Sequence, residues 1–215
     1  MRTLDFWFDP ISPYAWLAFD ALPDALAGFS VRVDYRPVLL AGLLAHWGQK
    51  GPAEVEPKRA WTYRDVAWRA HRQGLRLELP AEHPFNPLPL LRLALAAAPA
   101  GEMPNRHVVE TVFRHVWHGG GDAVDAQRLE TLRQTLQTER DPASAEVKDE
   151  LRHLGAQAIA QGVFGVPTVV VDGRAFWGAD ALPMLREHLS GSGWCAGPGW
   201  DQAAAPRPAT RRPSS

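Results

Sequence analysis

Residues 4–17 read LDFWFDPISPYAWL, which predicts a strand directly followed by a helix. The strand is indicated by residues 4–8, which are short, rich in aromatic side chains and ended by a turn signal. Ser12 and Pro13 are the residue types preferred at the N-cap and at the first position of a helix. Apolar residues at helical spacing continue over residues 16–26, so this helix is expected to bury one face.

A second strand and a long helical block follow. Residues 31–37 alternate between apolar and polar side chains, as in a half-buried strand. Together with the first strand and helix they form a β-α-β unit, which makes a parallel sheet with a right-handed crossover. Beyond residue 39 the patterns are almost all helical, with helices expected over residues 58–73, 86–98, 106–117, 125–138 and 143–161.

Strand signals return near the C-terminal end. Residues 168–171 and 174–177 flank Asp172-Gly173, which is a strong hairpin signal, and a last helix is expected over residues 179–189. The pattern therefore predicts an α/β fold whose sheet is split by a helical insertion. We expect one sheet domain from residues 1–38 and 162–190, a connecting helix over 143–161 and an inserted helical domain over 39–142.

Residues 191–215 have a different composition and are expected to form a disordered tail. Ser, Gly, Pro, Ala and Thr dominate this stretch, and such a composition buries too little surface to offset chain entropy. The tail holds Cys195, the one cysteine of the chain. A redox cycle between two protein thiols is therefore excluded, and Cys195 is expected to be incidental to function.

Charge and hydropathy exclude several classes of partner. The 215 residues carry 23 Lys and Arg against 24 Asp and Glu, which is a poor match to a nucleic-acid-binding surface. No apolar run reaches the roughly 18–20 residues that a membrane-spanning helix requires. The N-terminal residues have acidic side chains where a signal peptide has its apolar stretch. The sequence thus predicts a cytoplasmic protein.

The first site candidate is Ser12, which stands between the predicted strand and helix. Its hydroxyl would lie at the positive end of the helix beside unpaired backbone N–H groups, and this geometry stabilises an anion such as a ligand thiolate or a phosphate. The alternative, which spacing alone favours, is that Ser12 only caps the helix.

The second candidate is the dipeptide Val166-Pro167, which immediately precedes a predicted strand. A cis bond there would turn the Val166 N–H and C=O outward, where an extended ligand can pair with them. Taken alone, this motif is only suggestive.

Taken together, the two candidates and several further motifs resemble one family. The stretch FDPISPYAWL at residues 8–17 is similar to the opening motif of the 2-hydroxychromene-2-carboxylate isomerases and kappa-class glutathione transferases. This family is a branch of the DsbA-like thioredoxin superfamily, and the resemblance covers residues 3–190. Further matches are RPVLL at 36–40, GQKGP at 48–52, HPFNPL at 83–88, GVFGVPT at 162–168 and FWGAD at 176–180.

The resemblance implies a thioredoxin-like fold with an inserted all-helical domain, and it implies glutathione as cofactor. Ser12 would be the catalytic residue, donating a hydrogen bond to the glutathione sulfur. Lys58 would pair with a glutathione carboxylate, and Asp180 would bind the γ-glutamyl ammonium. The implied cofactor-binding residues are Gln49, Lys58, Trp61, Val166, Pro167, Ala179 and Asp180. A solvated helix start at Lys58 and a first-turn acid at Asp180 are the alternatives.

Departures from the family pattern concern the substrate more than glutathione. Gln49 stands where the family has Asn, and Ala181 stands where many members have Arg. The resemblance implies a glutathione-dependent isomerase of an aromatic, conjugated 2-oxo acid, and a homodimer for which the sequence shows no interface. The alternatives are a kappa-like glutathione transferase and a non-catalytic thioredoxin-fold binding module.

The histidines and tryptophans of the helical block are expected to be mainly structural. His107, His115 and His118 have no cysteine or third close ligand beside them, so an exposed helix face is expected rather than a metal site. The tryptophans of the helical block are expected mostly in the core, with one or two lining an aromatic pocket: Trp47, Trp61, Trp68 and Trp117.

Overall fold

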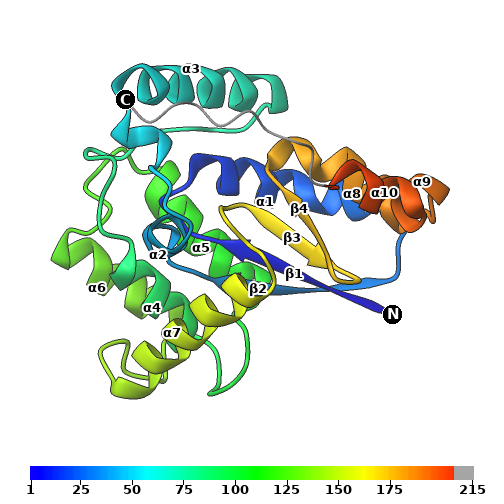
Figure 1. The fold of residues 1–215 in the computed structure, drawn as a ribbon. Helices are drawn as coiled ribbons and strands as arrows, with labels where there is room; N and C mark the ends of the chain where they lie inside the picture. The colour runs from blue at the N-terminus through cyan, green and yellow to red at the C-terminus, as the bar shows by residue number, and fades with distance from the viewer. Residues whose placement is uncertain (206–215) are drawn as a thin grey trace, which may run out of the picture.

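The computed structural model describes residues 1–205, which form a mixed four-stranded sheet surrounded by helices (Figure 1). The strand order is β2-β1-β3-β4. β1 and β2 pair in parallel, whereas β3 is antiparallel to both β1 and β4. The strand bounds are Arg2–Phe8 for β1, Val31–Pro37 for β2, Thr168–Val171 for β3 and Arg174–Trp177 for β4.

Alternation along β1 sends side chains into two separate cores. Leu4, Phe6 and Phe8 are fully buried on one face, where they join the cluster formed with α1, α5 and α8. Trp7 is buried on the other face with α2 and α7. The helices are α1 (Pro13–Leu26), α2 (Leu40–His46), α4 (Leu88–Ala96), α5 (Arg106–Trp117), α7 (Ala145–Ala160) and α8 (Leu182–Leu189).

The buried side chains of β1 fix the position of its C-terminal end, which leads into the turn that contains Ser12. Fully burying one large apolar side chain stabilises a fold by roughly 1.5–3 kcal/mol. Because both faces of β1 are covered, the strand is a rigid support for the residues that come after it.

Helix α3 (Glu56–Gln73) lies at the margin of the fold, along the upper edge in Figure 1. Only Val66 and Ala70 are buried in it, and they pack with Leu17 of α1. It contacts the 3-10 helix η1 (Pro52–Glu54). The insertion also contains α6 (Ala126–Leu136), and a second 3-10 helix, η2 (Ala179–Ala181), precedes α8. Helix α3 is therefore attached by a narrow apolar strip.

The predicted order of elements is confirmed. β2, β3, β4 and α5 have the predicted bounds, and the other predicted elements shift by no more than a few residues at their ends. Along the chain, helices α2 to α6 come between β2 and β3, as expected for a helical insertion that splits the sheet. No helix within residues 1–205 is long and apolar enough to cross a membrane.

The prediction of a disordered tail is wrong for residues 191–205. Two short helices form there, α9 (Gly193–Ala196) and α10 (Pro198–Ala203). Cys195 is fully buried, and the Trp200 ring packs on Phe176 of β4 with ring centroids 5.4 Å apart. A few large apolar side chains thus anchor the segment although small residues dominate its composition. The rest of the predicted tail, residues 206–215, lies outside the described residues.

Candidate functional site

The site begins at the turn that joins β1 to α1, residues 9–12, which we call the Ser12 turn. Ser12 is the N-cap of α1, with extended backbone and a side-chain Oγ that accepts a hydrogen bond from the Ala15 N–H at 3.3 Å. The predicted cap is therefore confirmed. The residue is buried, so its hydroxyl lies at the helix N-terminus in a setting of low dielectric.

Ser12 faces the loop that precedes β3. Its hydroxyl donates a hydrogen bond to the Val166 carbonyl at 3.4 Å, a long and weak bond. The Val166–Pro167 peptide bond is cis. Residues 154 positions apart in the chain thus meet at one point, and the structure brings together Ser12, Val166 and Pro167 of the predicted site.

The main-chain N–H of Val166 lies next to this contact. Among the hydrogen bonds formed within residues 1–205, none has the Val166 N–H as donor, although the residue is buried. Buried main-chain donors are nearly always paired in native proteins. An unpaired donor next to a serine hydroxyl and a helix N-terminus is suited to a ligand that brings its own acceptor.

The segment after β4 packs on the same region. The Gly178 N–H donates to the Pro167 carbonyl at 2.9 Å. Ala179 is half-buried and packs with Leu17 of α1, whereas Asp180 is exposed. The chain can make this turn because Gly178 has φ 97° and ψ 157°, a conformation that is essentially restricted to glycine.

We expect Gly178→Ala to lower the free energy of unfolding by about 1–3 kcal/mol, because alanine is strained at this φ and ψ. The new Cβ would also collide with the Asp180 carboxylate. The matched control is Gly155→Ala in the middle of α7, where a Cβ would meet no atom within 4 Å. That variant is expected to gain about 0.5–1 kcal/mol. Urea unfolding measures both, and equal stabilities for the two variants would contradict the strain at Gly178.

The other three predicted residues lie on the helical insertion, away from these contacts. Gln49, Lys58 and Trp61 are all exposed. Within residues 1–205 no hydrogen bond joins their side chains to the Ser12 turn. One hydrogen bond connects the insertion to the loop that contains Val166. The Trp47 indole N–H donates to the Val163 carbonyl at 3.0 Å, three residues before Val166.

Comparisons with known proteins show the family of this chain. The family model described as a DSBA-like thioredoxin domain matches residues 3–190. The chain belongs to this family. The predicted thioredoxin-like fold with a helical insertion, and the resemblance to its isomerase and kappa branch, are therefore confirmed.

The individual relatives are isomerases and glutathione transferases. The 2-hydroxychromene-2-carboxylate isomerase of Sphingobium xenophagum is 29% identical over 195 residues, covering 87% of this chain and 98% of the relative. Glutathione S-transferase kappa 2 of Caenorhabditis elegans is 25% identical over 209 residues, covering 88% and 92%. A solved structure of a 2-hydroxychromene-2-carboxylate isomerase has a TM-score of 0.74 at 22% identity, covering 95% of this chain and 100% of that one.

In this DSBA-like chain, Asp9 is a site residue that the sequence analysis did not single out. Its side chain is fully buried at the end of β1. One carboxylate oxygen accepts from the Ile11 N–H at 3.0 Å, and the other accepts from the Leu40 N–H at 2.9 Å. Burial raises the pKa of Asp9 to about 7, against the opposing effect of those two hydrogen bonds. Asp9 thus ties the Ser12 turn to the first residue of α2.

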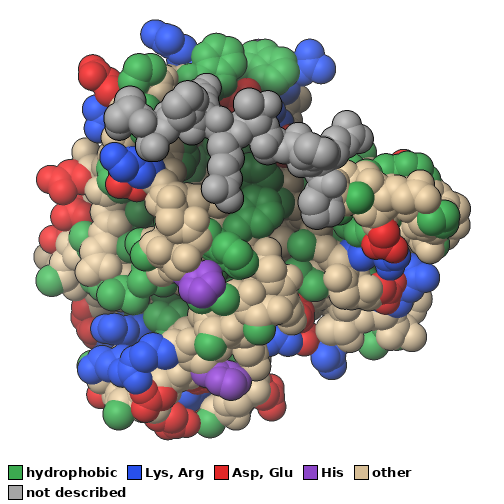
Figure 2. Space-filling view, viewed as in Figure 1, with side chains coloured by type: hydrophobic (Ala, Val, Ile, Leu, Met, Phe, Trp, Pro, Cys, Tyr) green, Lys and Arg blue, Asp and Glu red, His purple; other side chains and the backbone are tan. Residues whose placement is uncertain are grey.

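The tryptophans depart from the predicted core positions. Trp117 is buried as predicted, and its indole N–H donates to the Pro10 carbonyl at 3.0 Å. Trp47, Trp61 and Trp68 are 43%, 65% and 58% exposed, so the core prediction is wrong for these three. For Trp61 and Trp68 the reason is the narrow attachment of α3, over which hydrophobic side chains gather at the upper edge of Figure 2. Trp47 is not on this helix but directly follows α2. The role of Trp61 in binding a cofactor stays a prediction.

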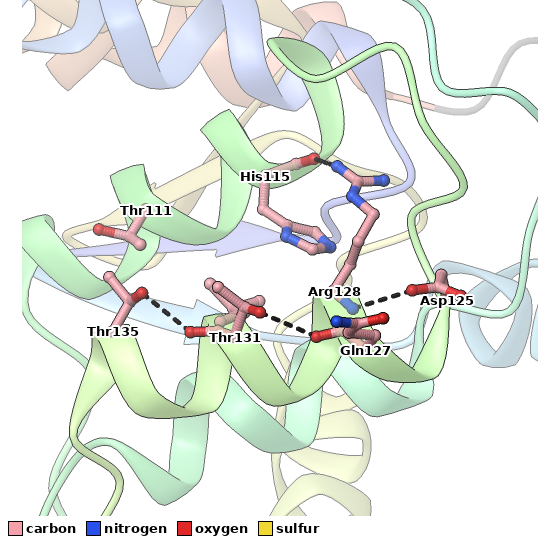
Figure 3. Close-up of a pocket in the computed structure, with 8 residues that line it drawn as sticks. Thr111, His115, Asp125, Gln127, Arg128, Thr131 and Thr135 are labelled. Carbon is pink, nitrogen blue, oxygen red and sulfur yellow. Dashed lines mark hydrogen bonds between the residues drawn. The ribbon is translucent and has the colours of Figure 1, made fainter.

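A hollow lies elsewhere, between α5 and α6 (Figure 3). It has a volume of about 510 Å³, and no predicted site residue lines it. Arg128 there donates to the His115 main-chain carbonyl of α5, and His115 Nε2 donates to the Ala123 carbonyl. His115 and His118 are half-buried, so the exposed-face prediction is wrong for both, whereas His107 is exposed as predicted. Within residues 1–205 no three His, Cys, Asp or Glu residues are grouped as a metal site. The predicted site residues that meet in the structure instead lie at the Ser12 turn.

Proposed function

We propose that this chain is a glutathione-dependent isomerase of aromatic 2-oxo acids of the 2-hydroxychromene-2-carboxylate type. One observation carries the proposal: the Ser12 hydroxyl lies at the N-terminus of α1 beside the Val166 N–H, which has no acceptor within residues 1–205. The similarity to an isomerase of that name over 87% of the chain supports the substrate class. A homodimer and a cytoplasmic location are part of the same proposal.

The residues fit the chemical groups of glutathione. A thiolate needs a donor, which Ser12 offers, and a cysteinyl carbonyl needs an N–H, which Val166 offers. Glutathione also carries carboxylates and an ammonium at its ends. Lys58 and Asp180 have the opposite charges, and neither has an ion-pair partner within residues 1–205. Gln49, Trp61, Pro167 and Ala179 complete the proposed binding residues.

The chain's own residues would prepare a sulfur anion. Bound glutathione supplies a thiolate that adds to the conjugated double bond of the substrate and leaves again after rotation about the resulting single bond. Ser12 would turn its hydroxyl hydrogen from the Val166 carbonyl to the sulfur, which is easy because the existing bond is long. The N-terminus of α1 favours negative charge at the same place and lowers the thiol pKa.

A kappa-like glutathione transferase is the second candidate. It is favoured by the similarity to glutathione S-transferase kappa 2, which extends over 88% of this chain. The same residues would then activate the same thiol, but the sulfur would stay on the product.

The product distinguishes the two candidates. We expect turnover of 2-hydroxychromene-2-carboxylate to require glutathione, to give a product of unchanged mass and to return all the glutathione, as mass spectrometry and a thiol titration can measure. A product that has gained the mass of glutathione would favour the transferase. Turnover at the same rate without glutathione would refute both.

A further inference from the structure

The carbonyl that precedes Ser12 is held by a side chain from a distant loop. His83 lies 72 residues from Ile11, and its Nε2 is 2.8 Å from the Ile11 carbonyl oxygen. Because Ile11 immediately precedes Ser12, this contact acts on the backbone that orients the serine hydroxyl. It is the shortest of the contacts that side chains make with the carbonyls of the Ser12 turn, the Trp117 bond to Pro10 being 3.0 Å.

The protonation of His83 follows from its two partners. A carbonyl oxygen only accepts, so Nε2 carries the hydrogen and donates to Ile11. Burial lowers the pKa of His83, so the ring is neutral near pH 7 and Nδ1 has a free lone pair. The Tyr63 hydroxyl lies 2.9 Å from this Nδ1 and 3.2 Å from the His83 carbonyl. The hydroxyl has one hydrogen for these two acceptors, and the shorter distance favours donation to Nδ1. This bond stabilises the tautomer that donates to Ile11.

Through Tyr63 the Ser12 turn is connected to α3. A second connection runs on the other side of Ser12, where the Tyr14 hydroxyl donates to the Asp65 carboxylate at 2.9 Å. The Arg69 Nε–H donates to the same carboxylate oxygen at 2.8 Å, so Asp65 is also in an ion pair. Helix α3 is thus hydrogen-bonded to the chain on both sides of Ser12, although its apolar contact is narrow.

We propose that His83 is a positioning residue: it holds the Ser12 turn in register with α3 by donating to Ile11 while accepting from Tyr63. This inference rests on the proposed function, because α3 carries Lys58 and Trp61, two of the proposed glutathione-binding residues. A glutathione molecule that contacts both Ser12 and α3 needs a fixed separation between them. The relay from Tyr63 through His83 supplies it.

The hydrogen bonds can be removed without removing the packing. The His83 ring also packs on Trp117 and Phe85, with ring centroids 5.6 and 6.0 Å apart. His83→Phe keeps a ring for these contacts but loses both nitrogens, whereas His83→Gln keeps an N–H donor for Ile11. Tyr63→Phe removes only the hydroxyl that fixes the tautomer.

The first test needs no glutathione. In His83→Phe we expect amide hydrogen exchange at Ser12, whose N–H donates to the Asp9 carbonyl, to be about 10-fold faster than in the wild type. Exchange in β1 should be unchanged. His83→Gln and the exposed control His107→Phe should both match the wild type. Wild-type protection of Ser12 in His83→Phe would overturn the proposal whatever the activity of the protein.

The second test asks whether His83 acts through Ser12. We expect His83→Phe to lower the glutathione-dependent kcat/KM by about 10- to 100-fold, with recovery of most of it in His83→Gln and an intermediate loss in Tyr63→Phe. When Ser12→Ala is already present, adding His83→Phe should lower kcat/KM little further, because the hydroxyl that His83 positions is gone. Fully additive losses would overturn the positioning role. A wild type without any glutathione-dependent turnover would instead refute the proposed function, and hydrogen exchange would still decide the role of His83.

Discussion

Ser12→Ala is expected to lower the glutathione-dependent kcat/KM by about 100- to 1,000-fold, the cost of removing one preorganised donor from a developing anion. The structure gives the hydroxyl two existing partners, the Val166 carbonyl and the Ala15 N–H. The Ala15 N–H donates to the hydroxyl oxygen and leaves the hydroxyl hydrogen free. The Val166 carbonyl accepts that hydrogen only in a long, weak bond, so the hydrogen is available to a sulfur anion. Initial rates over a range of glutathione concentrations measure the loss.

The same substitution also removes a helix cap, and this effect must be separated from the chemical one. Loss of a serine N-cap costs about 1 kcal/mol of stability. Ser144 provides the matched control, because it caps α7 by accepting from the Val147 N–H at 3.2 Å. Ser144→Ala should lose similar stability and keep wild-type turnover. A comparable loss of turnover in both variants would mean that Ser12 is only a cap.

The second large effect concerns Asp9 and the pH dependence of stability. Burial raises the pKa of Asp9 from 3.8 to about 7 in the folded protein. The folded state therefore holds this proton more tightly than the unfolded chain does. Stability from this group is fully present below pH 3.8 and is lost as the pH rises to about 7. At 1.36 kcal/mol for each pKa unit, the loss is on the order of 4 kcal/mol.

Asp9→Asn cannot titrate, so its free energy of unfolding should lack this loss between pH 4 and 7. The amide nitrogen cannot accept a hydrogen bond, so one of the two main-chain bonds is lost, at a pH-independent cost of about 1–3 kcal/mol. The test therefore lies in the slope of stability against pH and not in the absolute value. The matched control is Asp141→Asn, whose carboxylate also accepts a main-chain N–H but is exposed. The free energy of unfolding is measured with urea at each pH. If it falls as steeply between pH 4 and 7 in Asp9→Asn as in the wild type, the assignment is contradicted.

The sequence was sufficient for those features that depend on local patterns. Ser12 and Pro13 are recognisable as a helix start because cap chemistry involves neighbouring residues only. Val166-Pro167 is recognisable because proline before a strand is unusual, and the family motifs connected it with Ser12. The cap is present, and the two segments do meet in the structure.

Features that depend on distant contacts could not be predicted. Asp9 accepts from a residue 31 positions away, and His83 donates to one 72 positions away; no local pattern encodes either pairing. The exposed Trp61 and Trp68 illustrate the same limit, since burial of a tryptophan depends on what packs over its helix. Around Cys195, composition misled because two tryptophans supply the apolar surface that small residues lack.

The central claim is that Ser12 and the N-terminus of α1 hold a glutathione thiolate. The most direct measurement is the ultraviolet absorbance of the thiolate in the protein–glutathione complex as a function of pH. For the wild type we predict a thiol pKa well below the value of about 8.5 for a free cysteine thiol. For Ser12→Ala we predict a pKa that rises toward that value, because only the N-terminus of α1 still favours the thiolate. Absorbance in the wild-type complex that titrates like free glutathione would contradict the claim.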